Sequence, residues 1–126
     1  MIAGIGTDIV AIARIARAIE RHGERFSAKV LASAELAACP VGARRAAYIA
    51  KRFAAKEAFF KAFGQPSSDA NTWHQLAILN DANGRPQMHF GALLADLLRA
   101  QGIAHWHVSL SDEHDFALAY VVLEKE

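Results

Sequence analysis

The chain has 126 residues, the length of one small domain, and a single cysteine, Cys39, so an internal disulfide is excluded and a reducing cytoplasm is expected. Its charged fraction of 21% excludes a disordered chain, and its longest apolar run, residues 116–123, is far shorter than the ~20 residues that span a bilayer. No targeting signal and no membrane partner are expected, because residues 1–10 carry no basic segment before their apolar positions.

The net charge of +1 hides an uneven distribution along the chain. Residues 11–62 hold 11 Lys/Arg and 4 Asp/Glu and carry +7, whereas the remaining 3 Lys/Arg and 9 Asp/Glu give −6. Such asymmetry favours an anionic partner or ligand for the basic part, and an accident of composition is the alternative.

The first predicted elements are a strand and a basic helix. Residues 1–10 predict a short strand interrupted by Gly4 and Gly6, and glycine within a strand often marks the close approach of another group to the backbone. Residues 11–22 predict a helix that ends at Gly23. Its two faces differ, with Ile12, Ile15 and Ile19 on one and Arg14, Arg17 and Arg21 on the other.

Two further helices are predicted before the middle of the chain. Ser27 is expected to cap a helix that runs through Leu36 and stops before Cys39-Pro40. The longest helical pattern covers residues 43–63, is rich in alanine and ends at Gly64, a residue typical of the position after a helix.

The second half of the chain predicts two hairpins around one helix. After a loop at residues 65–71, strands at 73–79 and 85–90 are joined through Asn83-Gly84, and strands at 105–110 and 116–124 form the second hairpin. The helix between them, at 91–101, is expected to face the core with Leu93, Leu94, Leu97 and Leu98.

This order of elements predicts the α+β fold class, with an antiparallel sheet of hairpins packed on the long helix in a single domain of residues 1–126. The 27 alanines suit helices that pack closely on a sheet, and they make oligomerisation attractive as a second source of burial.

Two carboxylates on separate elements could share one hard cation, although their spacing alone favours a structural role. Asp8 lies near the end of the first strand, and Glu57 borders the apolar face of the long helix. Mg²⁺ takes only one or two protein carboxylates beside water and phosphate oxygens, so two residues suffice. The alternative is that Asp8 merely ends a strand and that Glu57 forms an i,i+4 ion pair with Lys61.

Four cations, Lys51, Arg52, Lys56 and Lys61, lie along the helix that carries Glu57. Lys61 is one turn beyond Glu57, within reach of a phosphate bound to a metal there. A solvated charged face is the alternative.

Histidine and cysteine give weaker signals. His105 and His107 share one face of a strand, as zinc ligands do, but no cysteine or further histidine has a supporting spacing. Cys39 has no activating motif, and no glycine-rich phosphate-binding segment is present. A buried, inert thiol and no zinc site are therefore expected.

Three segments carry a family resemblance. They are Met-Ile-Ala-Gly-Ile-Gly-Thr-Asp-Ile-Val at residues 1–10, Arg-Phe-Ala-Ala-Lys-Glu-Ala-Phe-Phe-Lys-Ala-Phe-Gly at 52–64, and His-Val-Ser-Leu-Ser-Asp at 107–112. Together they resemble the holo-acyl-carrier-protein synthase family, the short bacterial 4′-phosphopantetheinyl transferases, over nearly the whole chain. Asn-Gly-Arg-Pro at 83–86 is similar to the family's Gly-Lys-Pro turn.

The resemblance implies an enzyme that moves 4′-phosphopantetheine from coenzyme A to a serine of apo acyl carrier protein, releases adenosine 3′,5′-bisphosphate and supports fatty acid biosynthesis. By position, Asp8 and Glu57 would hold Mg²⁺ against the pyrophosphate, and Lys61 would neutralise charge on a phosphate oxygen. The base that takes the serine proton is either Glu57 or a metal-bound water that Glu57 orients.

The resemblance also implies how the ligands are held. Arg52, Lys61, Pro86 and His107 fall where the family contacts coenzyme A. The basic first helix resembles the surface that binds the acidic carrier protein, and here it carries Arg14, Arg17 and Arg21.

The family's trimeric assembly implies a homotrimer with active sites between subunits. In that assembly Arg44, Arg45 and the turn at 85–86 would serve a nucleotide held mainly by the next chain.

The chain departs from the family pattern at three places. Gln-Pro-Ser-Ser at 65–68 replaces a Gly-Thr-Gly-type loop, so the backbone N–H contacts expected from that loop are not implied for this chain. Ala11 stands where Glu is frequent, and Asp112 stands where His is common. A binding module without turnover is the second hypothesis. No nucleic-acid partner is expected, because the arginine face has no aromatic residues between its basic ones.

Overall fold

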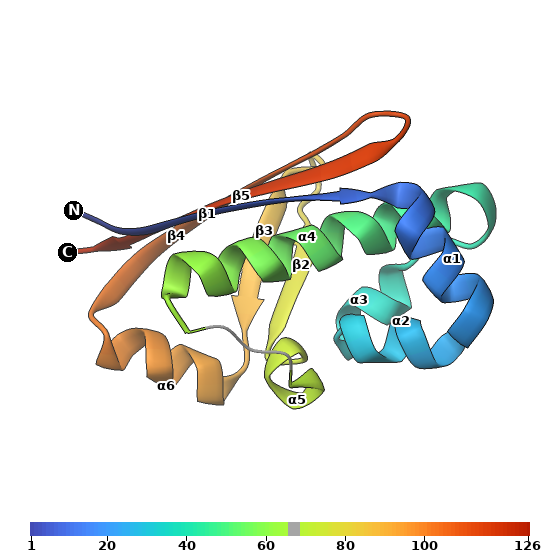
Figure 1. The fold of residues 1–126 in the computed structure, drawn as a ribbon. Helices are drawn as coiled ribbons and strands as arrows, with labels where there is room; N and C mark the ends of the chain where they lie inside the picture. Colours follow the sequence, from blue (N-terminus) through green and yellow to red (C-terminus); the bar gives the residue numbers. More distant parts are fainter. Residues whose placement is uncertain (66–68) are drawn as a thin grey trace.

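Helix α4 (Arg45–Phe63) lies at the centre of the molecule, with a three-stranded sheet on one side and a hairpin and short helices on the other (Figure 1). The structure is a computed structural model that describes residues 1–65 and 69–126. Among the described residues, no helix has both the length and the apolar character needed to cross a bilayer.

The main sheet has the strand order β1-β5-β4 and is antiparallel throughout. Its strands are β1 (Ile2–Ala11), β5 (Phe116–Lys125) and β4 (Ile103–Asp112). β5 lies in the middle, and backbone hydrogen bonds between Met1 and Lys125 hold the two chain ends side by side (Figure 1). The predicted α+β class is confirmed, and the hairpins form two sheets rather than one.

Strand β1 lies directly on helix α4 because its glycines have no side chain. A Cβ atom on Gly4 would be 1.9 Å from the carbonyl oxygen of Ala62, and one on Gly6 would be 1.8 Å from that of Ala58. The predicted close approach at these glycines is therefore confirmed. The small residues on both elements bring β1 and its Asp8 against the helix.

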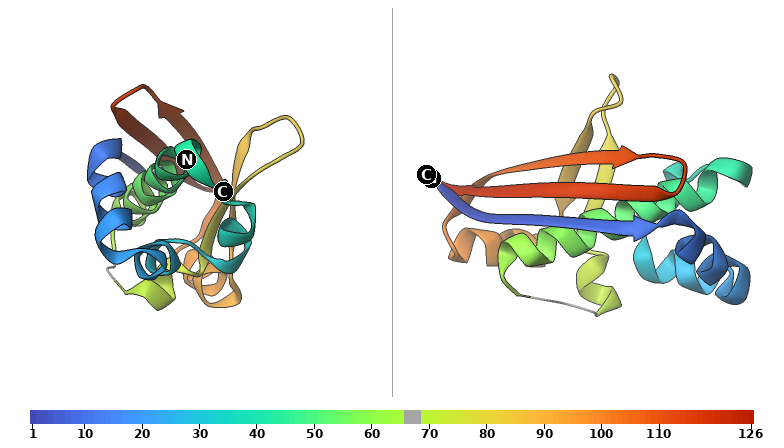
Figure 2. Two further views of the ribbon diagram at one scale, coloured as in Figure 1. Left: turned by 90° about the vertical axis from the view of Figure 1, so that its right-hand side faces the viewer. Right: turned by 45° about the horizontal axis from the view of Figure 1, so that its top comes forward.

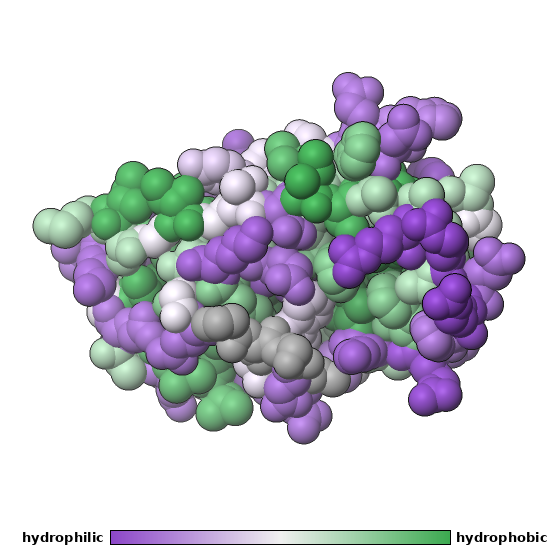
Figure 3. Space-filling model, in the orientation of Figure 1, coloured by the Kyte–Doolittle hydropathy of each residue, from purple (hydrophilic) through white to green (hydrophobic). Residues whose placement is uncertain are grey.

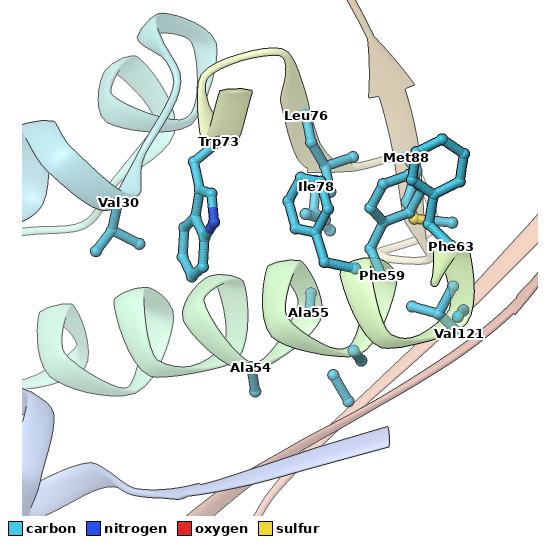
Figure 4. Packing of buried hydrophobic residues seen from close by; sticks show 14 of the residues in the cluster. Val30, Ala54, Ala55, Phe59, Phe63, Trp73, Leu76, Ile78, Met88 and Val121 are labelled. Atoms are coloured by element: carbon cyan, nitrogen blue, oxygen red, sulfur yellow. The ribbon is translucent and has the colours of Figure 1, made fainter. Parts of the chain in front are cut away.

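The opposite side of α4 holds the aromatic part of the core. Phe59, Phe63, Trp73 and Ile78 gather there, whereas Ala54 points toward β1 (Figure 4). The elements on this side are α5 (Ala70–Trp73), β2 (Leu76–Asn80), β3 (Pro86–Phe90) and α6 (Ala92–Ala100). Large side chains thus fill the wider gap, and alanines face the sheet.

Helix α1 (Ile12–His22) packs along one flank of α4, and the β2–β3 hairpin projects on the other (Figure 2, left). Ile15 is fully buried, and the arginines of the opposite face are exposed, as their spacing predicts. The chain continues through α2 (Glu24–Val30), α3 (Ser33–Ala38) and a 3₁₀ turn (Gly42–Arg44) into α4.

The prediction of one helix from Ser27 through Leu36 is wrong. Ser27 lies inside α2, buried, and its hydroxyl accepts a hydrogen bond from Arg45 instead of capping the helix. The helix breaks at Leu31 and Ala32, which are extended. The Glu35 carboxylate accepts the Ala32 N–H at 2.9 Å and so stabilises the start of α3.

Two predictions in the second half also need correction. Trp73 ends helix α5, and strand β2 begins only at Leu76. Of the four leucines of α6, Leu94 and Leu98 are buried, whereas Leu93 and Leu97 are 60% and 41% exposed. A helix that packs with a single i,i+4 row buries only that row. Residues 66–68 of the predicted loop lie outside the described residues.

Candidate active site

The structure brings Asp8 of β1 and Lys61 of α4 together. The Lys61 Nζ atom is 3.2 Å from Asp8 Oδ1 and donates a hydrogen bond to the Thr7 carbonyl oxygen at 2.9 Å. The side chain of Lys61 remains 55% exposed. Among the described residues, Lys61 therefore forms its ion pair with Asp8 of β1. The alternative, an i,i+4 ion pair between Lys61 and Glu57 on the helix, is not formed.

Glu57 is half-buried one turn before Lys61. Burial raises the pKa of its carboxyl group, and the charge of Asp8 raises it further, while Lys61 and Arg14 act in the opposite direction. Asp8 and Glu57 are thus close enough to repel each other, and a cation between them would relieve that repulsion.

The chemistry of these donors fits Mg²⁺. Asp8 and Glu57 offer hard carboxylate oxygens, and Mg²⁺ is usually held by one or two carboxylates together with substrate phosphates. In residues 1–65 and 69–126, no group of three or more His, Cys, Asp or Glu side chains forms a metal cage. The pair therefore suits an ion shared with a phosphate ligand more than a closed structural site.

Lys56 does not belong to this cluster, although it precedes Glu57 in the sequence. Its Nζ atom donates to Glu35 Oε1 at 2.6 Å and to the carbonyl oxygens of Val30 and Trp73, and neither side chain of the pair is exposed. Burial lowers the pKa of Lys56, and the adjacent Glu35 opposes that shift. Glu35 gives no signal in the sequence, because it stands in an alanine-rich stretch with no motif around it.

Arg52, predicted as a coenzyme A contact, is also buried in this chain. It is 2% exposed, donates to the Ile78 carbonyl oxygen at 3.2 Å and packs over the ring of Tyr48 at 3.9 Å. Burial lowers its pKa. Lys51 pairs with Asp112. The four cations of α4 are therefore not one solvated face, and Lys61 is the member that reaches Asp8.

A groove of about 630 Å³ lies between β3 and β4. Pro86 and His107, predicted as coenzyme A contacts, both line it, together with Arg85. His107 donates from Nε2 to Glu124 at 2.7 Å, and His105 lies beside Glu126 instead. The two histidines thus have separate carboxylate partners. None of the groove residues belongs to the Asp8–Glu57–Lys61 cluster.

The arginines of α1 form the predicted basic face. Arg14, Arg17 and Arg21 are exposed, and the most hydrophilic side chains on this side of the molecule gather over α1 and α2 (Figure 3). Arg14 also packs over the ring of Phe53 on α4, 5.5 Å from its centre.

Residues 4–121 match the sequence model of the ACPS family, described as the 4′-phosphopantetheinyl transferase superfamily. A holo-[acyl-carrier-protein] synthase of Halorhodospira halophila is 48% identical over 123 residues, which cover 98% of each chain. The crystal structure of the Neisseria meningitidis holo-[acyl-carrier-protein] synthase has a TM-score of 0.92 and 44% identity and covers 99% of this chain and 100% of its own. A Bacillus anthracis holo-(acyl-carrier-protein) synthase in complex with CoA (3′,5′-ADP) has a TM-score of 0.82 at 30% identity, with 100% of this chain and 99% of its own covered.

Proposed function

Because the chain belongs to the holo-[acyl-carrier-protein] synthase family of 4′-phosphopantetheinyl transferases, we propose that it modifies an apo acyl carrier protein of fatty acid biosynthesis in a Mg²⁺-dependent reaction. The serine oxygen of the carrier forms a bond to the phosphorus next to the pantetheine. The phosphorus–oxygen bond to adenosine 3′,5′-bisphosphate breaks, and the serine proton passes to a base. The cluster of Asp8, Glu57 and Lys61 on β1 and α4 is the observation that carries this proposal.

Each member of the cluster has a distinct task. Asp8 and Glu57 would hold Mg²⁺, which supplies positive charge that stabilises and orients a pyrophosphate when bound. Lys61 offers its exposed ammonium group to a phosphate oxygen as charge builds on the leaving group. Glu57 is a candidate for the base, since its raised pKa brings it closer to a group that accepts a proton near neutral pH.

The groove between β3 and β4 is the proposed site for the nucleotide part of coenzyme A. Pro86 and His107 line it, and the relative from Bacillus anthracis binds CoA. Arg52 is not included in this nucleotide site because its side chain is buried. The groove shares no residue with the Asp8–Glu57–Lys61 cluster, which supports a site completed by two subunits.

A homotrimer would also cover the outer face of the main sheet. This face carries exposed apolar side chains on β1 and β5, which colour the end and the upper edge of the molecule green in Figure 3. They are Ile2, Ile5, Ile9, Phe116, Leu118 and Tyr120. Such a contiguous apolar face favours a subunit interface. Light scattering after gel filtration should give the mass of three chains, and Leu118→Glu should shift it toward one.

The arginine face of α1 is the proposed docking surface for the acidic carrier protein. Arg21→Glu should raise KM for the carrier and leave KM for coenzyme A unchanged, because Arg21 has no contact with the groove. The effect should be largest at low salt, since the Debye length falls from about 10 Å at 0.1 M to about 3 Å at 1 M. An unchanged carrier KM at low salt would exclude this surface.

The deciding experiment is mass spectrometry of an apo acyl carrier protein incubated with the enzyme, coenzyme A and Mg²⁺. We expect the carrier to gain one phosphopantetheine, and we expect EDTA, Asp8→Asn or Glu57→Gln to reduce the rate by orders of magnitude. Carrier binding without any mass gain would support the alternative, a binding module without turnover.

We propose that this reaction takes place in the cytoplasm, because the thiol of Cys39 is unpaired.

A further inference from the structure

Arg14 differs from the other two arginines of its face. Its guanidinium group packs over the ring of Phe53, with Cζ 5.5 Å from the ring centre, whereas no ion pair or ring contact joins Arg17 or Arg21 to another described residue. A cation over an aromatic ring is attracted by the negative face of the ring. Arg14 is thus directed toward α4, and its two neighbours are directed toward solvent.

Phe53 is one turn before Glu57 on the same side of α4, so the contact with its ring brings Arg14 to the edge of the Asp8–Glu57–Lys61 cluster. Along this side of α4, Arg14 over Phe53 lies one turn before Glu57, and Lys61 with its partner Asp8 lies one turn after it.

The charges of the cluster show what Arg14 adds. Asp8 and Glu57 carry two negative charges, and Lys61 carries one positive charge, so these three residues leave an excess of negative charge. A bound Mg²⁺ would turn this excess into a single positive charge, whereas the pyrophosphate of coenzyme A carries two negative charges. A second fixed cation would balance the pyrophosphate, and a guanidinium group stays charged at every working pH.

We propose that Arg14 belongs to the transfer site as well as to the docking face, and that its charge, held on Phe53, helps to retain the pyrophosphate of coenzyme A beside Asp8, Glu57 and Lys61. This role rests on the proposed function and goes beyond docking. A residue that only docks the carrier acts when the carrier is present, whereas Arg14 acts on coenzyme A without it.

Isothermal titration calorimetry of coenzyme A into the enzyme with Mg²⁺, in the absence of carrier protein, separates the two roles. Arg14→Ala should weaken coenzyme A binding roughly threefold to tenfold, the range for one partly screened charge near an anion. Arg14→Lys should recover part of the loss. The matched controls are Arg17→Ala on the same face and Arg99→Ala on α6, whose arginine pairs with Asp96, and both should bind coenzyme A as the wild type does.

A second measurement uses the complete reaction. At saturating carrier protein and limiting coenzyme A, Arg14→Ala should still react more slowly, with a raised KM for coenzyme A, because extra carrier does not replace a missing charge at the phosphate. A coenzyme A affinity and a coenzyme A KM equal to those of the wild type, with only the carrier KM raised, would overturn the role of Arg14 and leave the proposed function intact. A wild-type enzyme that neither binds coenzyme A nor modifies the carrier would overturn both.

Discussion

Lys56 and Lys61 lie five residues apart on helix α4 and have opposite surroundings. Lys56 faces α2 and α3, has no exposed surface, and donates to Glu35 and to the carbonyl oxygens of Val30 and Trp73. Lys61 faces β1, is 55% exposed, and pairs with Asp8 at the edge of the sheet.

This difference separates a charge that is closed off in the core from a charge that a ligand can reach. The buried ammonium of Lys56 has three oxygen partners and no path to a ligand, and Glu35 also accepts the N–H groups of Ala32 and Ile78. Together they join α4 to α2, α3, α5 and β2. The ammonium of Lys61 keeps a surface open to solvent, so an anion can reach it. We therefore expect the loss of a partner of Lys56 to reduce stability, and the loss of Lys61 to reduce activity.

The largest effect on the free energy of unfolding is expected for the buried pair. Glu35→Ala leaves the Lys56 ammonium without its counter-charge in the core and should cost about 3–5 kcal/mol. Thermal unfolding should show a decrease in Tm on the order of 10 °C or more. The double variant Glu35→Leu with Lys56→Met should recover much of the loss, and a double variant no better than Glu35→Ala would contradict this account.

A smaller loss of stability is expected at the contact between β1 and α4. Gly6→Ala puts a Cβ atom 1.8 Å from the Ala58 carbonyl oxygen, so the strand or the helix must move, at a cost of about 1–3 kcal/mol. The move also separates Asp8 from Lys61, so activity should fall with stability. In the control, Gly91→Ala, the added Cβ meets the flexible Gln75 side chain, and the loss in a urea titration should be smaller.

Lys61→Met tests the role of the exposed lysine. The pair with Asp8 is more than half solvated on the lysine side, so its loss should change the free energy of unfolding by less than about 1 kcal/mol. The loss of one charge that stabilises the transition state should lower kcat/KM about a hundredfold. A decrease in Tm with unchanged kinetics would show instead that Lys61 is structural.

The smallest effect on stability, and one of opposite sign, is expected for Glu57→Gln. Because the pKa of Glu57 is raised in the folded protein, its ionised form destabilises the fold as the pH rises through that pKa. In EDTA, the variant should therefore have a slightly higher Tm than the wild type at pH 7.5, and the gain should disappear below the ordinary glutamate pKa. A lower Tm for Glu57→Gln than for the wild type at pH 7.5 would contradict the prediction that ionised Glu57 destabilises the fold. Added Mg²⁺ with coenzyme A should then raise the Tm of the wild type more than that of the variant.

Local signals in the sequence predicted most of the elements correctly. The isoleucine stripe of α1, the Asn83-Gly84 turn and the end of α4 at Gly64 depend on residues near each other in the chain, and the structure confirms them. The break between α2 and α3 was missed because Glu35 stabilises it through contacts with Lys56 and Ile78, which lie 21 and 43 residues away.

The sequence by itself predicted the fold class and the family, because these depend on local periodicity and on motifs, and through the family resemblance it proposed Asp8, Glu57 and Lys61 as site residues. Only the tertiary structure decided which charges are open to a ligand. Arg52 and Lys56 stand beside Glu57 in the motif and are buried, and Arg14, far from it in the chain, lies over Phe53. Spacing along a helix gives the direction of a side chain, but the elements packed against that helix determine whether the side chain meets water, a partner or the core.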